Sequence, residues 1–363
     1  MYKLIKKEAN SFILEFKDLI VTLQKITVCY FPDLTAKWVI DKLLGNCIST
    51  ENYFLFSNSG EVTKIDEEGN ILEKFNFFIQ YDAVINLYGK PCLLGYKKKD
   101  GEKIFGLYNF DEGKFIWNLR IKIANSKFIY KDSLYTNLFN EDFELDNTQL
   151  FSFSLNSGKQ LWQFSFSQLS NYITDEGEEK LVELVSIIGV YNTILWLLVT
   201  DRRLVGLNAE TGALLHEVNL CESLGLKPQT VENYSFSMNN LAFKAHLDEE
   251  KGIIKSFAHR YYWELDLNTL KADIKVDFGP GNTWRIQKSK FYEGDKNLYF
   301  IGAKNGETFD RAIGIFDTEK YEITWYDEPL GEGRYLFFTD IQANDKLLGA
   351  LDSEQNLRIY EKV

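Results

Sequence analysis

The sequence has few of the residues that usually carry metal-dependent or acid–base catalysis. Only three of its 363 residues are histidine and four are cysteine, and no C-x-x-C pair is present. The histidines are His216, His246 and His259, and none is spaced as a metal ligand relative to another histidine or a cysteine. Zinc sites need several such ligands close together. We therefore expect no metal, and no histidine-based catalytic residue.

The cysteines also indicate the compartment. Cys29, Cys47, Cys92 and Cys221 are far apart, and Cys29 and Cys92 lie inside apolar, strand-like runs. Small buried thiols are typical of proteins kept in a reducing compartment. The first residues, MYKLIKKEANSFILEF, lack the long apolar region and small-residue cleavage site of a secretory signal. The sequence therefore predicts a cytoplasmic protein.

Basic charge is also scarce. Lysine and arginine number 41 against 53 acidic residues, which gives a net charge of −12. A nucleic-acid partner requires a basic stripe. The one short basic run, Lys97–Lys99, is followed at once by Asp100 and Glu102. We expect no nucleic-acid partner, and an acidic surface that would favour a basic one.

A membrane-spanning segment is not expected either. The longest apolar stretch, Leu181–Val199, contains Glu183 and Asn192 and is broken in the middle by Gly189. A spanning helix needs about 20 apolar residues in succession. Two core strands joined by a turn explain this stretch better. No membrane partner is predicted.

A repeated phrase is what the sequence does have. It reads LVGLNAETGALLHEV at Leu204–Val218, LFSFSLNSGKQLWQF at Leu150–Phe164 and IFGLYNFDEGKFIWNL at Ile104–Leu119. Each unit is an apolar strand, a polar turn and a second strand with an aromatic residue. Strand-built units that recur about every 35–60 residues are typical of a β-propeller. Only five prolines and an aromatic content of 15% are consistent with many strands.

Within the phrase, a turn glycine precedes an aromatic residue by four positions. Gly113 precedes Trp117, Gly158 precedes Trp162, and Gly212 precedes His216. Trp325 follows Tyr321 at the same spacing, and Trp38 ends the first unit without the glycine. Glycine supplies the left-handed conformation of a tight hairpin loop, and a large aromatic residue can wedge between neighbouring blades. We expect these residues to be structural, with Trp117, Trp162 and Trp325 buried at equivalent places.

The frame at Asn208–His216, Ser154–Trp162, Asn109–Trp117 and Asp317–Trp325 resembles the repeat of PQQ-type (quinoprotein-like) β-propellers. The resemblance extends over most of the chain. It implies a propeller fold, but such repeats build quinone-dependent dehydrogenases, assembly scaffolds and interaction domains alike. A working quinoprotein site would need an acidic base, a calcium ion and a stacking tryptophan, often with adjacent cysteines. No motif places such a site, so no catalytic or cofactor-binding residue and no cofactor is predicted.

The number of blades follows from the outer-strand positions. These are Trp38, Glu73, Trp117, Trp162, His216, Ile274 and Trp325. The tail Leu347–Val363 lacks an outer strand, which the apolar-alternating head Tyr2–Lys7 could supply, thereby closing the ring. We predict an all-β fold, a single β-propeller domain over residues 1–363, with about eight four-stranded blades closed by an N-terminal strand. Seven blades is the alternative, if Leu19–Asp41 and its neighbours merge into one blade.

These observations predict a non-catalytic platform that binds a protein partner, which would be basic. Rigid propellers present loops at their rim, and the sequence offers such loops at Asn140–Thr148, Tyr172–Glu183, Asn219–Asn233 and Phe278–Trp284. The alternative is a quinone-dependent or other small-molecule enzyme with its site in the axial channel.

Overall fold

The computed structural model describes residues 2–9, 11–15, 20–23, 26–30, 34–42, 44–50, 52–58, 60–87, 90–99, 102–110, 112–139, 144–173, 177–200, 202–226, 245–258, 261–279, 284–291, 296–304, 310–328, 336–344 and 346–363. Within these residues the only helical elements are α1 (Leu220–Ser223) and the 3₁₀ turn η1 (Phe166–Gln168). All other regular elements are strands, so the fold is all-β as predicted.

The chain forms two compact units, which are described separately. Unit 1 comprises Met1–Ile104, Tyr108–Lys114 and Asn282–Val363, and unit 2 comprises Phe105–Leu107 and Phe115–Gly281. The single domain over residues 1–363 therefore stays a prediction.

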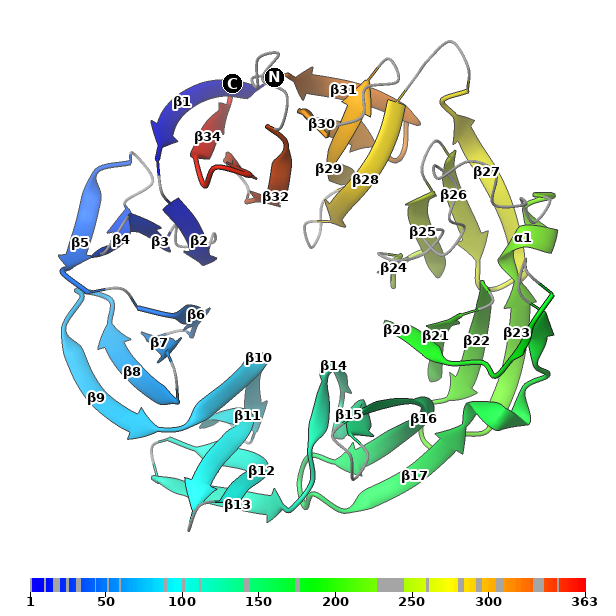
Figure 1. Ribbon diagram of the computed structural model, residues 1–363, viewed down its shortest axis with the longest axis horizontal. Helices are drawn as coiled ribbons and strands as arrows, with labels where there is room; N and C mark the ends of the chain where they lie inside the picture. Colours follow the sequence, from blue (N-terminus) through cyan, green and yellow to red (C-terminus); the bar gives the residue numbers. More distant parts are fainter. Residues whose placement is uncertain are drawn as a thin grey trace. The chain divides into compact units, whose positions relative to one another are not determined.

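The strands assigned wholly or partly to unit 1 build five four-stranded sheets (Figure 1). In spatial order the sheets are β28 (Trp284–Phe291), β29 (Asn297–Lys304), β30 (Ala312–Asp317) and β31 (Glu322–Asp327); β32 (Phe338–Ala343), β33 (Leu347–Asp352), β34 (Leu357–Lys362) and β1 (Tyr2–Glu8); β2 (Ser11–Glu15), β3 (Ile20–Leu23), β4 (Ile26–Tyr30) and β5 (Ala36–Ile40); β6 (Asn46–Ser49), β7 (Tyr53–Asn58), β8 (Glu61–Asp66) and β9 (Ile71–Asn76); β10 (Phe78–Leu87), β11 (Lys90–Lys99), β12 (Glu102–Asn109) and β13 (Lys114–Leu119).

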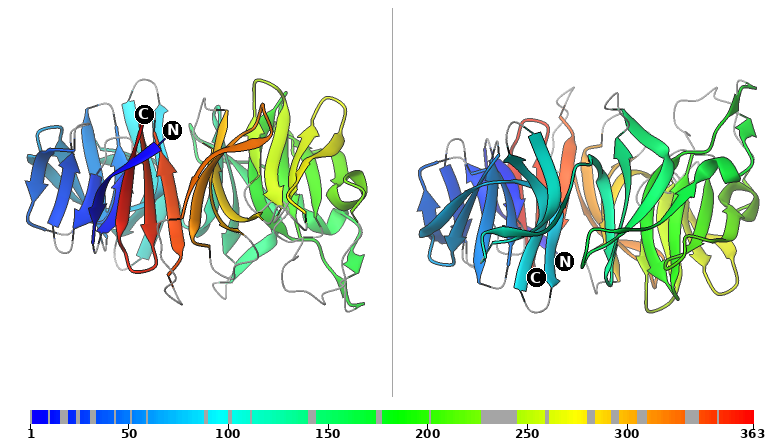
Figure 2. Two further views of the ribbon diagram at one scale, coloured as in Figure 1. Left: turned by 90° about the horizontal axis from the view of Figure 1, so that it is seen from above. Right: turned by 90° about the horizontal axis from the view of Figure 1, so that it is seen from below.

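Unit 2 holds three further four-stranded sheets and one short ribbon. The sheets are β14 (Ile123–Tyr130), β15 (Ser133–Phe139), β16 (Leu145–Ser154) and β17 (Gln160–Ser165); β20 (Leu184–Tyr191), β21 (Ile194–Val199), β22 (Arg203–Asn208) and β23 (Leu214–Asn219); β24 (His246–Asp248), β25 (Ile253–Ala258), β26 (Tyr261–Asp266) and β27 (Lys271–Asp277). The ribbon pairs β18 (Tyr172–Ile173) with β19 (Glu179–Lys180). The described residues thus contain eight four-stranded sheets, and Figure 2 shows the strands of each sheet running side by side.

The N-terminal strand completes the C-terminal sheet, as the sequence predicted. β1 pairs antiparallel with β34, from Tyr2 opposite Lys362 to Glu8 opposite Leu357. The ring of Tyr2 lies 5.5 Å from that of Trp325 on β31 of the neighbouring sheet. Because β1 pairs with β34, it covers the edge that β34 would otherwise expose.

Apolar side chains between successive sheets form the core of each unit. In unit 2, Trp196 and Leu204 of one sheet pack with Ile254 and Trp263 of the next. Because the middle strands are covered on both faces, their sequences are continuous apolar runs and do not alternate between apolar and polar residues. All six residues of β30, for example, are buried. The apolar stretch Leu181–Val199 contains β20 and β21, which are joined by a two-residue turn, as expected from the sequence.

Candidate functional site

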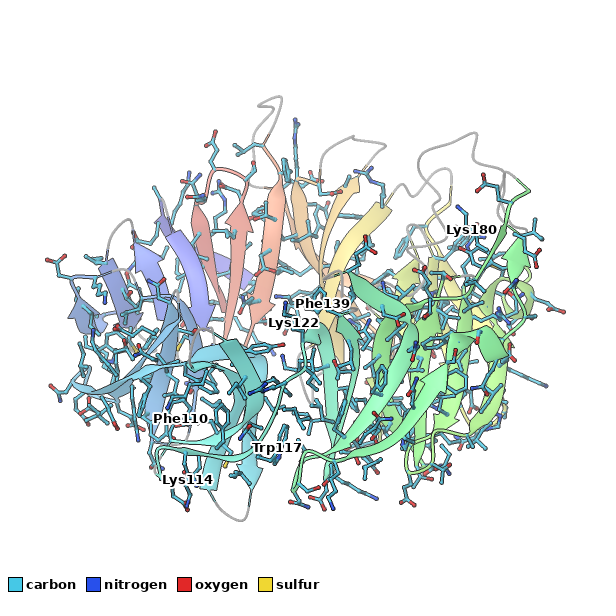
Figure 3. The ribbon with its side chains drawn as sticks, turned by 60° about the horizontal axis from the view of Figure 1, so that its bottom comes forward. Phe110, Lys114, Trp117, Lys122, Phe139 and Lys180 are labelled. Carbon is cyan, nitrogen blue, oxygen red and sulfur yellow. The ribbon has the colours of Figure 1, made fainter. Side chains whose placement is uncertain are left out.

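The recurring glycine and tryptophan meet between sheets and not within one. The indole of Trp117 covers Gly158 of the next sheet, where an added Cβ would lie 2.6 Å from Cε3 of the ring. The indole of Trp162 covers Gly212 in the same way, at 2.7 Å. Both tryptophans are buried, with 7% and 8% of their surface exposed, and Trp117 is labelled in Figure 3. Each pair therefore fixes one sheet against the turn of its neighbour.

Hydrogen bonds hold these indoles in place. Nε1 of Trp162 donates to the carbonyl oxygen of Ala209 at 3.0 Å, and Nε1 of Trp117 donates to that of Leu155. The acceptors are equivalent, because Leu155 and Ala209 each follow the first residue of the turn. A buried N–H is costly without an acceptor, so the bond orients the ring as well as stabilising it.

Trp38 repeats the contact but not the hydrogen bond. Its Cγ would lie 2.7 Å from a Cβ added at Gly69 of the next sheet. Its buried Nε1 has no hydrogen-bond partner among the described residues.

Gly113 has the turn conformation without the tryptophan. Its φ is +65°, yet no described residue lies within 4 Å of an added Cβ. The preceding sheet has Glu73 at the position that Trp38, Trp117 and Trp162 occupy in their sheets, so no indole of that sheet reaches this turn. Instead, Phe75 of β9 meets Phe110 at a centroid distance of 4.6 Å. Gly113 is thus required for its backbone conformation alone.

The last two aromatic positions have different surroundings. His216 is partly buried and stacks on Trp196 of its own sheet, with ring centroids 5.8 Å apart and planes 6° apart. Trp325 is partly buried as well, and packs against Tyr2 and Tyr360. This differs from the expectation that Trp325 is buried like Trp117 and Trp162. The reason is that the β33–β34 turn has Gln355, at φ +63°, in place of a glycine.

Asn or Asp side chains that open these turns accept hydrogen bonds from the turn backbone. Oδ1 of Asn208 accepts hydrogen bonds from the backbone N–H groups of Glu210 and Thr211. Asp266 does the same for Asn268 and Thr269. The hydrogen bond from the Asn268 backbone lowers the pKa of Asp266, because it stabilises the ionised carboxylate. Asn208 and Asp266 therefore stabilise the turns that they open.

The predicted rim segments are described in part. Residues 140–143, 174–176, 227–233 and 280–283 lie outside the described residues. Leu145–Thr148 belongs to β16, and Asn219 caps α1 by accepting from the Glu222 N–H. Tyr172–Glu183 contains the β18–β19 ribbon, the one two-stranded sheet in the described part of the chain.

The ribbon has an inner and an outer face. Side chains alternate across a strand, and Tyr172 lies opposite Lys180 while Ile173 lies opposite Glu179. Val182 is buried, and Tyr172 packs against the apolar core of unit 2. Alternation therefore turns Ile173 and Leu181 outward, and their surfaces are 65% and 53% exposed.

Polar groups surround the outward residues. Nδ2 of Asn171 donates to Oε1 of Glu179 at 3.0 Å, and Glu179 lies opposite Ile173 in the ribbon. Lys180 forms an ion pair with Glu178 at 3.2 Å, and Figure 3 shows Lys180 at the margin of unit 2. We call Asn171, Ile173, Glu179 and Leu181 the outer ribbon face. It combines two exposed aliphatic side chains with a positioned carboxylate.

The described residues contain no group of three or more His, Cys, Asp or Glu side chains able to hold a metal ion. His259 lies outside them. None of the four cysteines forms a disulfide with another. None of the helices in the described part has the length and apolarity required to cross a bilayer.

Comparison with solved structures defines the class of fold. The C-terminal WD40 domain of Sif2 aligns with 100% of this chain and 99% of its own, at a TM-score of 0.60 and 12% identity. Saccharomyces cerevisiae Sqt1 aligns with 93% of this chain and 91% of its own, at 0.57 and 10% identity. BamB from Moraxella catarrhalis aligns over 87% and 96%, at 0.45 and 12% identity. No protein-family model and no curated protein matches the sequence. The fold is a β-propeller, as predicted.

The outer ribbon face was only partly visible in the sequence. The sequence predicts Tyr172–Glu183 only as a rim loop, whereas it contains two strands of two residues each. The signal that could have indicated the outer ribbon face is the pair of apolar residues Ile173 and Leu181, which stand on either side of a charged run in the sequence.

Proposed function

We propose that this propeller is a non-catalytic platform that binds a protein partner, and that the partner is basic. The observation that carries the proposal is the outer ribbon face, where Ile173 and Leu181 are exposed beside the carboxylate of Glu179. Exposed apolar residues with a polar surround are a common feature of protein-binding surfaces. A net charge of −12 favours encounter with a cationic partner.

We also propose that the repeats are of the PQQ-type and that the protein works in a reducing, cytoplasmic environment. The glycine–tryptophan contacts at Gly158 and Gly212 support the first point, because they use the two residues that define the repeated frame. The four free thiols support the second.

Cross-linking in native extracts, followed by purification of the captured protein and titration calorimetry, tests the platform. We expect a captured protein of high isoelectric point that binds directly and more weakly as salt increases, since surface charges are screened. Salt-independent binding would contradict the basic partner. Binding of PQQ and calcium, with dye-reducing activity, would contradict the non-catalytic function and favour the quinone-dependent alternative.

A further inference from the structure

We propose that the β18–β19 ribbon is the docking site, and that it takes up an extended segment of the partner in which aliphatic and basic side chains alternate along one face. This inference rests on the proposed function and specifies where and how the partner binds.

The first argument is the backbone. β18 and β19 pair only with each other in the described part of the chain, so each has a second edge without a strand neighbour. A two-stranded ribbon by itself is marginally stable in water. An added strand pairs with an open edge through backbone hydrogen bonds and is stabilised by side chains at alternate positions. The ribbon is therefore a template for an extended segment.

The second argument is the position of the side chains. Ile173, Glu179 and Leu181 share the outer face. A third strand would lie about 4.8 Å from the ribbon, with every second side chain on that face. On that face, an aliphatic residue of the added strand would contact Ile173 or Leu181, and a lysine or arginine two positions away would reach Glu179. Because neighbouring residues point to opposite faces, the aliphatic and basic residues must be two positions apart.

The third argument is charge, which separates the ribbon from the other exposed apolar residues. The described residues of this segment, Asn171–Ile173 and Gly177–Glu183, contain three carboxylates and a single lysine. The similarly exposed Ile71 and Leu72 lie on β9, where Lys74 forms a 3.0 Å ion pair with Glu61 and the charges are more evenly balanced. An excess of carboxylates next to aliphatic side chains fits a cationic, aliphatic segment and repels an acidic one.

A short synthetic peptide that repeats valine, threonine, lysine and threonine, labelled for fluorescence anisotropy, is the probe, because it places valine and lysine alternately on one face. Two control peptides isolate the contributions: one has glutamate in place of lysine, and one has alternate backbone amides N-methylated, which removes hydrogen-bond donors while keeping the charge. We expect binding of the first peptide only. Equal binding of the N-methylated peptide would overturn strand addition, and absence of binding by the lysine–valine peptide would overturn the site.

Protein variants locate the binding. Ile173→Ser combined with Leu181→Ser, and separately Glu179→Lys, should each weaken peptide binding about tenfold or more. The matched control is Leu161→Ser, an equally exposed aliphatic residue on β17, which we expect to leave binding unchanged. Because all these side chains are at the surface, the variants should melt like the native protein.

The remaining outcomes are decisive as well. A captured partner that binds all these variants as tightly as the native protein would leave the platform intact and overturn the ribbon as its docking site. A native protein that is dimeric in sedimentation, and monomeric after Ile173→Ser with Leu181→Ser, would assign the face to a second copy of this chain and overturn the basic partner there.

Discussion

Alanine at Gly212 should cost far more stability than alanine at Gly113, although both glycines occupy the same place in the repeated frame. Their φ angles are +72° and +65°, so alanine pays the left-handed penalty of about 1–2 kcal/mol at either position. At Gly212 the new methyl group would also lie 2.7 Å from two ring carbons of Trp162, whereas at Gly113 nothing lies within 4 Å.

The contact sets the size of the difference. Overpacking of a well-packed core costs about 1–3 kcal/mol. We therefore expect a loss of about 1–2 kcal/mol for Gly113→Ala, and of about 2–5 kcal/mol for Gly212→Ala. Gly158→Ala should resemble Gly212→Ala, because its methyl group would meet Trp117 at 2.6 Å.

Urea unfolding of the three variants measures these losses. A double-mutant cycle then assigns the excess to the indole: in a Trp162→Ala background, Gly212→Ala should cost no more than Gly113→Ala does in the native protein. Equal costs for the three glycine variants in the native background would refute the argument that tryptophan fixes neighbouring blades through these turns.

Four further predictions concern the tryptophans, the N-terminal strand, the Asp248 ion pair and the cysteines. Trp162→Phe should cost about 1 kcal/mol more than Trp38→Phe in urea unfolding, because only Trp162 donates a hydrogen bond; equal costs would contradict this. Deleting residues 1–8 should lower the melting temperature strongly, since β34 then pairs with β33 alone and loses β1 from its other edge. An unchanged melting temperature would show that β1 is dispensable. Burial opposes ionisation of Asp248, but hydrogen bonds from Lys255 Nζ and a backbone N–H hold its pKa below the usual value. The ionised Asp248 carboxylate therefore stabilises the fold above about pH 4, and this contribution is lost as the pH falls further. Asp248→Asn should make the free energy of unfolding depend less on pH in that range. An unchanged pH dependence would exclude the Asp248–Lys255 ion pair as its source. Thiol titration of the unfolded, unreduced protein should find four free cysteines, and a recovered disulfide would contradict a reducing compartment.

The repeat could be recognised in the sequence because its turns depend on local backbone requirements. A left-handed glycine and an Asx residue are required wherever such a turn occurs, so Asn208 and Gly212 could be read without the structure. Which glycine is covered depends instead on the preceding sheet. Gly113 looks like Gly158 in sequence, and differs because Glu73 stands where a tryptophan would reach it.

Features that depend on pairing between distant segments could not be predicted in the same way. Trp325 packs on Tyr2, whose contact depends on closure by the opposite end of the chain. The outer ribbon face was harder still to predict, because strands of two residues are too short for an alternating pattern to be recognised. Its character comes from Ile173 and Leu181, which are eight positions apart in sequence and brought to one face by the hairpin.

Hydrogen exchange of the protein, alone and bound to its purified captured partner, tests the central claim most directly. Strand addition at the ribbon predicts slower exchange of the β18 and β19 amides in the complex, with little change in the first strands of the sheets, such as β28 and β32. Protection of those first strands without protection of β18 and β19 would contradict the account and place the ligand elsewhere.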